Sequence, residues 1–489
     1  MSRSSEGYLW TKSNLAEGLP TQAVIPSTAN LKPSYDVIII GAGFAGLRAA
    51  RELVRHHALS VLIIEGRDRI GGRTWTAEAF GESFEMGGTW VHWNQPHVYA
   101  ELHRYNLHKN LKSTAGSTVA QKTYYKGPGV EVQEIDGSTL AGITQAVAEK
   151  FFTIDGLSSR ELMPYPHDPF REPGPWKAYD HLTARQRLEQ LDLPTLHKGY
   201  FESSINTFGS APSTEIGFVE ALRWYALGGH NMAQVFENAG AYKLGNGGMT
   251  SFARSILADA RSDILLNTVV SEIIQNNASS VVIKSENGRT FEAKKVISTI
   301  PLNCLSGVKF SPPLSPLKCE AIAKGHITKG AKIHFKLGST EPGWFAASAD
   351  SANSSFCFSL SDHNGTSSAG PCGTYAIGFG YSGRLQTLRD SKHIIERFKK
   401  ELRPDAEVEG YLTHDWTNDP LAKGAWCCWG SDSMTRYLQE LQKAHGNVFF
   451  ASADWADAWR GFVDGALESG LKTAQDVARE LNVGPEPRL

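Results

Sequence analysis

The chain has 489 residues, 41% of them hydrophobic, which is enough to bury a large core and to build two domains. A formal net charge of −2 gives no strong field for nucleic acid or an anionic membrane, so we expect a small-molecule partner. The chain has neither a long apolar run able to span a bilayer nor an N-terminal secretory segment, which predicts a soluble protein without a membrane anchor.

Residues 1–35 are polar and are interrupted by Pro20, Pro26 and Pro33. Proline neither donates to a strand ladder nor continues a helix. This segment therefore predicts an extended N-terminal arm laid over the surface of the domain that follows.

A nucleotide-binding signature begins directly after the arm. The apolar run from Val37 to Ile40 predicts a buried parallel strand, and a glycine-rich turn then opens an alanine-rich helix. Gly41 permits the tight turn, Gly43 lets the backbone approach a pyrophosphate, and Gly46 lets the helix lie close to the sheet. The N–H groups at the start of this helix, next to Ala45, would face the phosphates.

The second strand, Val61 to Ile64, ends in Glu65, at the position where an acidic side chain can accept both ribose hydroxyls. A carboxylate at this point disfavours a 2′-phosphate. The flanking strands, helix and acidic residue predict a dinucleotide site far more specifically than the glycines alone, but they do not separate NAD from FAD.

A second loop of glycines and arginines follows Glu65 and could meet the diphosphate from its other side: Gly66, Arg67, Arg69, Gly71, Gly72 and Arg73. Here the sequence resembles the flavin amine oxidase family, whose motif recurs as EGRDRIGGRTW and EMGGTWVHW. The resemblance extends from Tyr35 to about Leu481 and is greatest to a fungal monoamine oxidase subgroup that holds FAD without a covalent bond. The alternative for the glycine and arginine loop after Glu65 is a basic loop on the surface without a ligand.

The resemblance implies an α/β fold class: a two-domain flavin amine oxidase fold with a discontinuous Rossmann-like FAD domain and an α+β substrate domain built on a mixed sheet. We expect the FAD domain to comprise residues 36–117, 246–320 and 418–482, and the substrate domain to comprise 118–245 and 321–417. Hydrophobic patterning predicts the following further elements: strands at 264–266, 269–274, 281–284, 290–293, 296–299, 332–337 and 374–380, and helices at 250–260, 391–402 and from about 464.

The resemblance also implies site residues. Lys332 falls where the family has a lysine bridged through water to flavin N5, and Trp426 and Phe462 fall on the two positions of an aromatic cage for the amine. Further cofactor contacts are implied for Gly88, Thr89, Trp90, Val270, Trp416, Ala425, Asp454 and Val463. Each of these residues could instead have no role in the site, because most lysines are exposed to solvent and most aromatic residues belong to the hydrophobic core.

Ala425 stands where the membrane-bound mammalian relatives have the cysteine that links to the flavin, so the resemblance implies non-covalent FAD. Cys427 and Cys428 lie close by and leave a different linkage open. The six cysteines contain no CxxC pair and lie near no histidine cluster, so we expect no metal site and no disulfide framework.

The implied activity is oxidative deamination of a primary amine, with O2 reduced to hydrogen peroxide. A polyamine oxidase would need an acidic tunnel, for which Glu215, Glu220 and Glu237 are candidates, whereas an L-amino acid oxidase would need an arginine clamp from Arg223 or Arg254. A catalytically silent FAD-binding scaffold is the alternative from another class. Hydride and polar nucleophilic transfer both remain open, as does the assembly, for which a homodimer is one expectation.

Residues 483–489 predict a disordered tail that ends in Pro487-Arg488-Leu489. This ending resembles the Ser-Lys-Leu peroxisomal address, so a peroxisomal location is expected if the signal is read and a cytoplasmic one otherwise.

Overall fold

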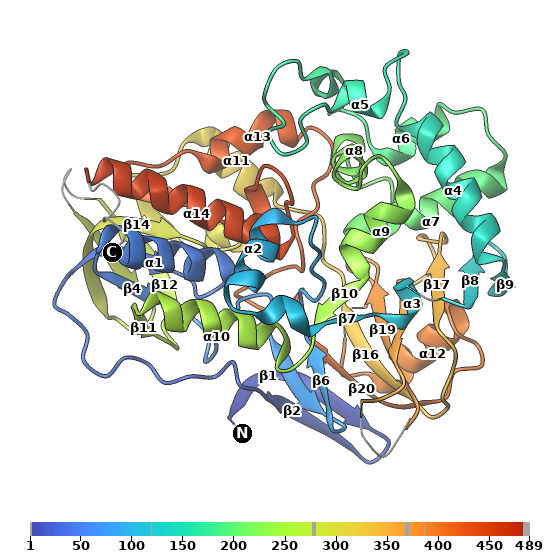
Figure 1. Ribbon diagram of the computed structural model, residues 1–489, viewed down its shortest axis with the longest axis horizontal. Coiled ribbons are helices and arrows are strands. Elements are labelled where there is room, and N and C mark those ends of the chain that lie inside the picture. Colours follow the sequence, from blue (N-terminus) through green and yellow to red (C-terminus); the bar gives the residue numbers. More distant parts are fainter. Residues whose placement is uncertain (1, 119, 276–279, 367–371, 386, 483–489) are drawn as a thin grey trace.

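The computed structural model describes residues 2–118, 120–275, 280–366, 372–385 and 387–482. Two large sheets, each covered by helices, lie at opposite ends of the molecule (Figure 1). No helix in these ranges is both long and apolar enough to cross a membrane. The C-terminal Pro487-Arg488-Leu489 lies outside the described residues.

The first sheet has eight strands from three separate parts of the sequence. Its centre is parallel, because β3 pairs with both β4 and β14 in the same direction. The strands are β3 (Tyr35–Ile40), β4 (Val61–Ile64), β11 (Asp263–Leu265), β12 (Val270–Ile274), β13 (Val281–Ser285), β14 (Thr290–Ser298), β15 (Lys309–Ser311) and β21 (Val448–Phe450).

Three helices lie side by side over one face of this sheet: α1 (Phe44–His57), α10 (Gly248–Ala260) and α14 (Val463–Glu480) (Figure 1). Glycines set how closely they approach. A Cβ on Gly46 would lie 2.1 Å from the carbonyl oxygen of Gly41, and a Cβ on Gly470 of α14 would lie 2.3 Å from that of Ala45. The start of α1 is therefore pressed against both the β3 turn and α14.

The second sheet has nine strands and is mostly antiparallel, with one parallel pair between β8 and β17. This mixture confirms the predicted mixed sheet. Its strands in spatial order are β2 (Asn14–Pro20), β1 (Arg3–Thr11), β20 (Val408–His414), β16 (Lys332–Leu337), β19 (Thr374–Gly380), β18 (Phe356–His363), β17 (Trp344–Ser348), β8 (Lys122–Lys126) and β9 (Gln133–Ile135).

The N-terminal segment differs from the predicted extended arm. Residues 3–20 form a hairpin whose strand β1 pairs with β20 and extends the edge of the nine-stranded sheet. Trp10 stacks on Tyr411 of β20 with ring centroids 5.4 Å apart. Pro20 stands at the end of β2 and Pro26 and Pro33 follow the hairpin, so none of the three prolines interrupts its strands.

Helices from the middle of the chain form a layer beside the second sheet, in which α3 and α7 contact β17 and β18 and the others pack on one another (Figure 1). They are α3 (Ala115–Thr118), α4 (Gly137–Phe151), α5 (Ser159–Leu162), α6 (Ala184–Glu189), α7 (Thr195–Gly209), α8 (Phe218–Leu227) and α9 (Met232–Gly240). The other elements are α2 (Pro96–Arg104), α11 (Pro316–Lys324), α12 (Ser391–Glu401), α13 (Met434–Gln442) and the pairs β5 (Thr76–Ala79) with β6 (Glu82–Glu85) and β7 (Leu111–Ser113) with β10 (Tyr242–Leu244).

The predicted strands and helices are largely confirmed, with one merger. The sequence predicted two strands at 290–293 and 296–299, whereas β14 runs continuously from Thr290 to Ser298. Lys294 and Lys295 break the apolar pattern, but both side chains reach carboxylates, Asp36 at 2.7 Å and Glu480 at 2.5 Å. The strand can therefore continue through them.

Candidate cofactor and substrate cavity

One cavity of about 820 Å³ runs between the two sheets. Its walls include the β3–α1 turn, the loop after β4, the N-terminus of α14, strands β16 to β19 and helices α4, α8 and α9. Nineteen of the residues that the sequence predicts for a cofactor and amine site line it, and these are Gly41, Gly43, Ala45, Glu65, Gly66, Arg67, Gly71, Gly72, Arg73, Gly88, Thr89, Trp90, Val270, Lys332, Trp416, Ala425, Trp426, Phe462 and Val463. Gly46, Arg69 and Asp454 are not among the described residues that line it.

The β3–α1 turn presents an anion-binding helix start to the cavity. Gly41 has a φ of +110°, which favours glycine, and α1 begins at Gly43 without a side-chain cap and without an acidic residue in its first turn. Gly43, Phe44 and Ala45 all line the cavity. The unpaired N–H groups and positive helix dipole at this point suit a diphosphate.

The two glycine loops meet directly beside this helix start. Gly43 pairs with Gly71 in an isolated bridge, and Gly72 is so near that a Cβ on it would lie 3.2 Å from Gly43 Cα. Both loops can approach a bound diphosphate because they carry no side chain at these glycines. Together with the N-terminus of α1, the two loops fit the diphosphate of a dinucleotide cofactor.

Glu65 joins the loops through backbone hydrogen bonds. Its carboxylate accepts the N–H of Ala42 at 2.6 Å and the N–H of Arg67 at 2.9 Å. Each carboxylate oxygen has a second lone pair, so the group can still accept hydroxyl protons from a ribose.

Arg73 is held from behind by Asp454. The Arg73 guanidinium donates to Asp454 Oδ1 at 2.6 Å and to the carbonyl of Ala425 at 2.9 Å, while Asp454 Oδ2 accepts the N–H of Leu302 at 2.8 Å. Although burial alone would raise it, Arg73 holds the pKa of Asp454 below its usual value. The resemblance implies a cofactor contact for Asp454; its carboxylate is fully buried and holds Arg73, which lines the cavity.

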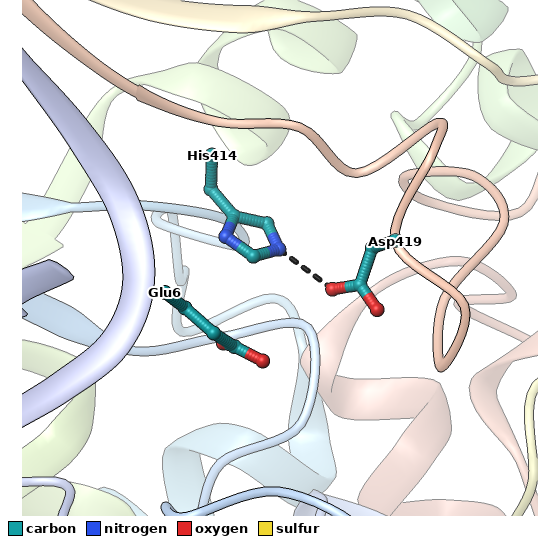
Figure 2. A group of neighbouring side chains, drawn as sticks. All are labelled: Glu6, His414 and Asp419. Carbon is teal, nitrogen blue, oxygen red and sulfur yellow. Dashed lines mark hydrogen bonds and ion pairs between the residues drawn. The ribbon is translucent and has the colours of Figure 1, made fainter. Parts of the chain in front are cut away.

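An ion network beneath the second glycine loop ties it to the N-terminal hairpin. Glu6 of β1 pairs with Arg67 and Arg69, and Arg67 also pairs with Asp419 at 2.7 Å. His414 lies 2.6 Å from the same Asp419 carboxylate, and Figure 2 shows these two side chains with Glu6 beside them. Glu6, His414 and Asp419 are spaced like metal ligands, but the two guanidinium groups already balance both carboxylates, so the cluster acts as an ion-pair network.

Lys332, the first residue of β16, is buried at the cavity wall. Its ammonium donates to the carbonyls of Glu85 and Gly87, each at 2.7 Å, and to the hydroxyl of Thr89. Burial lowers the pKa of Lys332, and the nearby Glu85 carboxylate opposes this. Because three acceptors match the three protons of an ammonium, the geometry suits the charged form.

The substrate end of the cavity is aromatic. Phe358 of β18 stacks on Phe379 of β19 with centroids 4.4 Å apart, and Trp426 meets Phe379 edge-on at 5.8 Å. The Trp426 indole N–H donates to the carbonyl of Phe208 at 2.7 Å, which fixes its ring. Trp90 lies on the other side of Phe379, at 5.9 Å.

Phe462 contributes from the start of α14. It is the N-cap of that helix without a side-chain cap, so the helix N-terminus faces the cavity together with Val463 and Ala466. The first-turn residue Asp464 accepts the N–H of Val98 at 2.7 Å, and burial raises its pKa to about 7. The positive dipole of α14 is therefore only partly offset near neutral pH.

The charged residues considered for binding a polyamine or an amino acid lie outside the cavity lining. Arg223 pairs with Glu220 at 2.6 Å in the core, Arg254 donates to the carbonyl of Gln22 at the surface, and Glu237 lies 3.6 Å from His92. None of these residues, nor Glu215, is among the described residues that line the cavity. The described residues that line the cavity include six charged ones, Glu65, Arg67, Arg73, Glu286, Lys332 and Lys423, of which Lys332 approaches the aromatic end, with its ammonium 6.0 Å from the centroid of Phe379.

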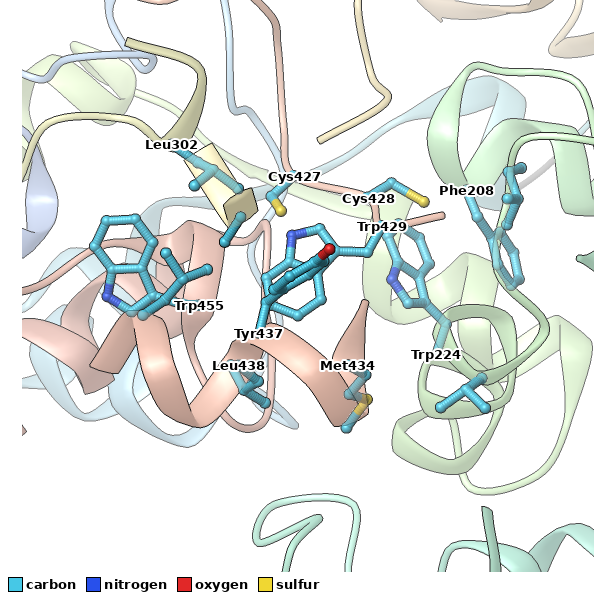
Figure 3. Packing of buried hydrophobic residues seen from close by; sticks show 14 of the residues in the cluster. Phe208, Trp224, Leu302, Cys427, Cys428, Trp429, Met434, Tyr437, Leu438 and Trp455 are labelled. Atoms are coloured by element: carbon cyan, nitrogen blue, oxygen red, sulfur yellow. The ribbon is translucent and has the colours of Figure 1, made fainter. Parts of the chain in front are cut away.

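Some cavity residues were not predicted from the sequence, notably Phe358, Phe379, Trp224 and Thr144. Phe379 stands in the alternating run TYAIGFG, whose pattern could have placed it on one face of the strand. Trp224 and Thr144 lie in helices without any local motif, so only the tertiary fold brings them to the cavity. Figure 3 shows Phe208 and Trp224 at the edge of the buried cluster around Cys428 and Trp429.

Cys427 and Cys428 are buried and belong to this cluster rather than to the cavity lining. The Cys427 thiol donates to the carbonyl of Asp454 at 3.3 Å, and burial raises the pKa of both thiols. Raised pKa values disfavour the reactive thiolate.

Comparison with known proteins agrees with this site. The model of the flavin containing amine oxidoreductase family matches residues 44–478. The chain is 35% identical to a pseudooxynicotine dehydrogenase from Pseudomonas sp., over 95% of this chain and 90% of that protein. It is 30% identical to a nicotine dehydrogenase from Pseudomonas putida, over 92% of this chain and 89% of that protein.

Among solved structures, a triple mutant of putrescine oxidase matches with a TM-score of 0.77 and 20% identity, covering 91% of this chain and 99% of that one. This likeness confirms the predicted fold class. The family match covers most of the chain and includes Gly46, the second glycine loop, Lys332, Trp426 and Phe462, while Gly41 and Gly43 lie just before it. The chain therefore belongs to the flavin-containing amine oxidoreductases, a family of amine oxidase enzymes.

Proposed function

We propose that the chain is an FAD-dependent monoamine oxidase that converts a primary amine to an imine, which hydrolyses to an aldehyde and ammonia. The observation that carries this proposal is the division of the cavity into a cofactor end rich in charged groups and a mainly aromatic substrate end, with Lys332 at the boundary between them.

The cofactor end fits FAD. The α1 N-terminus and the two glycine loops would hold the diphosphate, Glu65 would accept from a ribose, and the walls from Gly88 to Trp90 with Trp416 would enclose the ring system. A bound flavin would supply the two-electron acceptance that amine oxidation needs. Ala425 carries no group for a covalent bond, and both neighbouring cysteines lie behind the wall, which favours non-covalent binding.

The substrate end favours an uncharged monoamine. Trp426, Phe462 and Phe379 exclude water from an amine placed among them, and this disfavours the ammonium form. A long polyamine would place its remote cations against an apolar wall, and an amino acid would bring a carboxylate with no arginine in reach. Both substrates would lose hydration without gaining a charge partner.

The reduced flavin must pass its electrons to an acceptor, for which there are two candidates. The cationic Lys332 at the cavity wall supports reduction of O2 to hydrogen peroxide, because it would stabilise negative charge developing on oxygen. The two bacterial relatives are named dehydrogenases, which favours an acceptor other than O2 as the second candidate.

The test is anaerobic reduction of the flavin in the purified yellow protein by butylamine, benzylamine, spermidine and L-amino acids. Bleaching by the two monoamines alone is expected; preference for spermidine or an amino acid contradicts the proposed substrate class, and no bleaching by any of them supports a scaffold. Adding O2 or a quinone to the reduced protein then separates an oxidase from a dehydrogenase. Acid precipitation should release the flavin into the supernatant.

A further inference from the structure

Lys332 and Glu85 are buried charged residues that bind only uncharged groups directly. The three hydrogen bonds of the Lys332 ammonium go to two carbonyls and a hydroxyl. The Glu85 carboxylate accepts the N–H of Met249 at 2.9 Å and the hydroxyl of Thr76 at 3.0 Å, and neither charged group is in direct ion-pair contact with another described residue. A buried charge without a partner in contact needs a counter-charge nearby.

The Glu85 carboxylate lies at the start of α10. This helix begins at Gly247 without a side-chain cap and has no acidic residue in its first turn. The carboxylate supplies that charge from β6, so close that a Cβ on Gly248 would lie 1.8 Å from its Oε1. Burial raises the pKa of Glu85, but the N–H of Met249 and the positive end of the helix dipole favour the ionised form.

The ammonium and the carboxylate meet at one residue. Lys332 donates to the carbonyl of Glu85 at 2.7 Å, which brings its charge close to the side chain of the same residue. Burial lowers the pKa of Lys332, and the Glu85 carboxylate raises it. Each of the two charges is therefore the nearby counter-charge of the other.

The other charged groups around Lys332 have partners of their own. The titratable side chains that face it from the surrounding elements are Glu85 of β6, Lys243 of β10, His334 of β16, Asp362 of β18 and His414 of β20. Lys243 forms an ion pair with Asp362, and His414 lies 2.6 Å from Asp419. Burial lowers the pKa of His334 to about 3, so this ring is neutral. Of the two carboxylates in this set, Glu85 is the one without a cation in contact.

We propose that Glu85 is a positioning residue whose carboxylate keeps the Lys332 ammonium protonated at the cavity wall and so sets the upper end of the pH range in which the reduced flavin reacts with O2. Lys332 lines the cavity and Glu85 is not among the described residues that do, so the carboxylate acts through the ammonium. This inference rests on the proposed function and names the residue that controls its oxygen reaction. An ammonium left with neutral acceptors alone releases its proton at lower pH.

The first measurement is reoxidation of the reduced protein by O2, followed by stopped-flow absorbance from about pH 6 to 10. In the wild type the rate constant should fall as the pH rises through the pKa of Lys332, because the charge that would stabilise reduced oxygen is lost. In Glu85→Gln, whose amide oxygen can still accept the N–H of Met249, this fall should begin at least about one pH unit lower. Glu85→Asp keeps a carboxylate and should stay closer to the wild type.

The second measurement reports the protonation of Lys332 without any reaction. The Cε resonance of 13C-labelled lysine in the flavin-loaded protein, assigned by its absence from Lys332→Met, should titrate lower in Glu85→Gln by the same amount as the reoxidation profile. The matched control is Glu82→Gln, since Glu82 is equally buried in β6 but accepts the N–H of Thr366 at 2.6 Å. This variant should leave both titrations unchanged.

The outcomes separate the two proposals. A Cε titration in Glu85→Gln at the wild-type pH overturns this inference and leaves the proposed function intact, and so does a reoxidation profile that does not follow the Cε titration. A further effect of Glu85→Gln on reoxidation in the Lys332→Met background would also contradict it, because Glu85 would then act through another group. If the reduced protein does not react with O2, the proposed oxidase function fails, while the Cε titration still tests the link between Glu85 and Lys332.

Discussion

Lys332 shows how a single buried charge can be prepared for chemistry. Its three hydrogen bonds to the segment Glu85–Thr89 fix the ammonium at the cavity wall, 5.2 Å from the centroid of the Trp90 ring. These acceptors offset part of the cost of burying the charge, and the nearby Glu85 carboxylate raises the pKa of Lys332 against the lowering that burial causes. The residue is therefore positioned before any ligand binds.

Replacing Lys332 by Met should slow reoxidation of the reduced protein by O2 at least about tenfold, because a fixed positive charge that would stabilise reduced oxygen is lost. Anaerobic reduction by benzylamine should change far less. Stopped-flow absorbance measures both half-reactions. Lys329→Met, a change at an exposed lysine in the preceding loop, is the control; two unaltered half-reactions in Lys332→Met would remove the assigned role.

Site residues that belong to a sequence motif could be predicted from the sequence. The glycine loops, Glu65 and Trp426 were found because short spacings or family patterns carry them. The exact contacts of Asp454 could not be predicted, since they depend on Arg73, which is far away in sequence. Thr144 and Trp224 have no local signature at all, and only packing reveals that they lack partners.

Among elements, the β3–α1 unit contains two glycines with different steric requirements. Gly43 has a φ of −76°, and a Cβ there would come no closer than 3.9 Å to other protein atoms, so alanine fits the protein itself. A Cβ on Gly46 would lie 2.1 Å from Gly41 O. The two glycines therefore serve different purposes although they belong to one motif.

Gly43→Ala should fold with a thermal midpoint close to that of the flavin-free wild type but purify with little flavin, because its methyl group enters the space of the diphosphate. Gly46→Ala should lower the thermal midpoint of the flavin-free protein itself. Absorbance at 450 nm and thermal denaturation distinguish the two. Full flavin content in Gly43→Ala would show that this loop does not touch the cofactor.

The N-terminal hairpin supplies the carboxylate that the second glycine loop needs. Although burial by itself would raise it, Arg69 and Arg67 together lower the pKa of Glu6 from 4.5. Glu6→Gln leaves two buried guanidinium groups short of a partner and should lower the free energy of unfolding by about 3 kcal/mol. Chemical denaturation at pH 7 measures the change.

The same network predicts the pH dependence. A carboxyl whose pKa is lower in the folded state stabilises above its unfolded pKa, so the free energy of unfolding should fall as the pH drops below about 4.5, and less steeply in Glu6→Gln. Glu17→Gln is the control on this hairpin, since its pair with Arg389 is exposed and should contribute little. Equal losses in the two variants would contradict the network's role.

Most elements could be predicted because their hydrophobic periodicity is strong, as in β3, β4 and β16. The hairpin was mistaken for an extended arm because a pairing partner nearly 400 residues away, β20, decides its structure. No pattern within residues 1–35 identifies that partner.

In the whole molecule, the two sheets and the helices between them enclose a cavity whose two ends differ in chemistry. The cofactor end combines two helix N-termini, arginines and Lys332, and so suits a group that accumulates negative charge. The described walls of the substrate end are mainly aromatic, with Lys332 at the boundary between the two ends. An amine that reaches it should therefore bind in its uncharged form.

Binding of the amine in its uncharged form is tested most directly by the pH profile of anaerobic flavin reduction with two amines of different basicity, butylamine and the less basic benzylamine. The ratio of the limiting rate to the dissociation constant should rise about tenfold per pH unit and level off at the pKa of each amine, hence at a lower pH for benzylamine. An inflection at the same pH for both amines, or a ratio that falls as the pH rises, would show that the protein selects the ammonium form and would contradict the account.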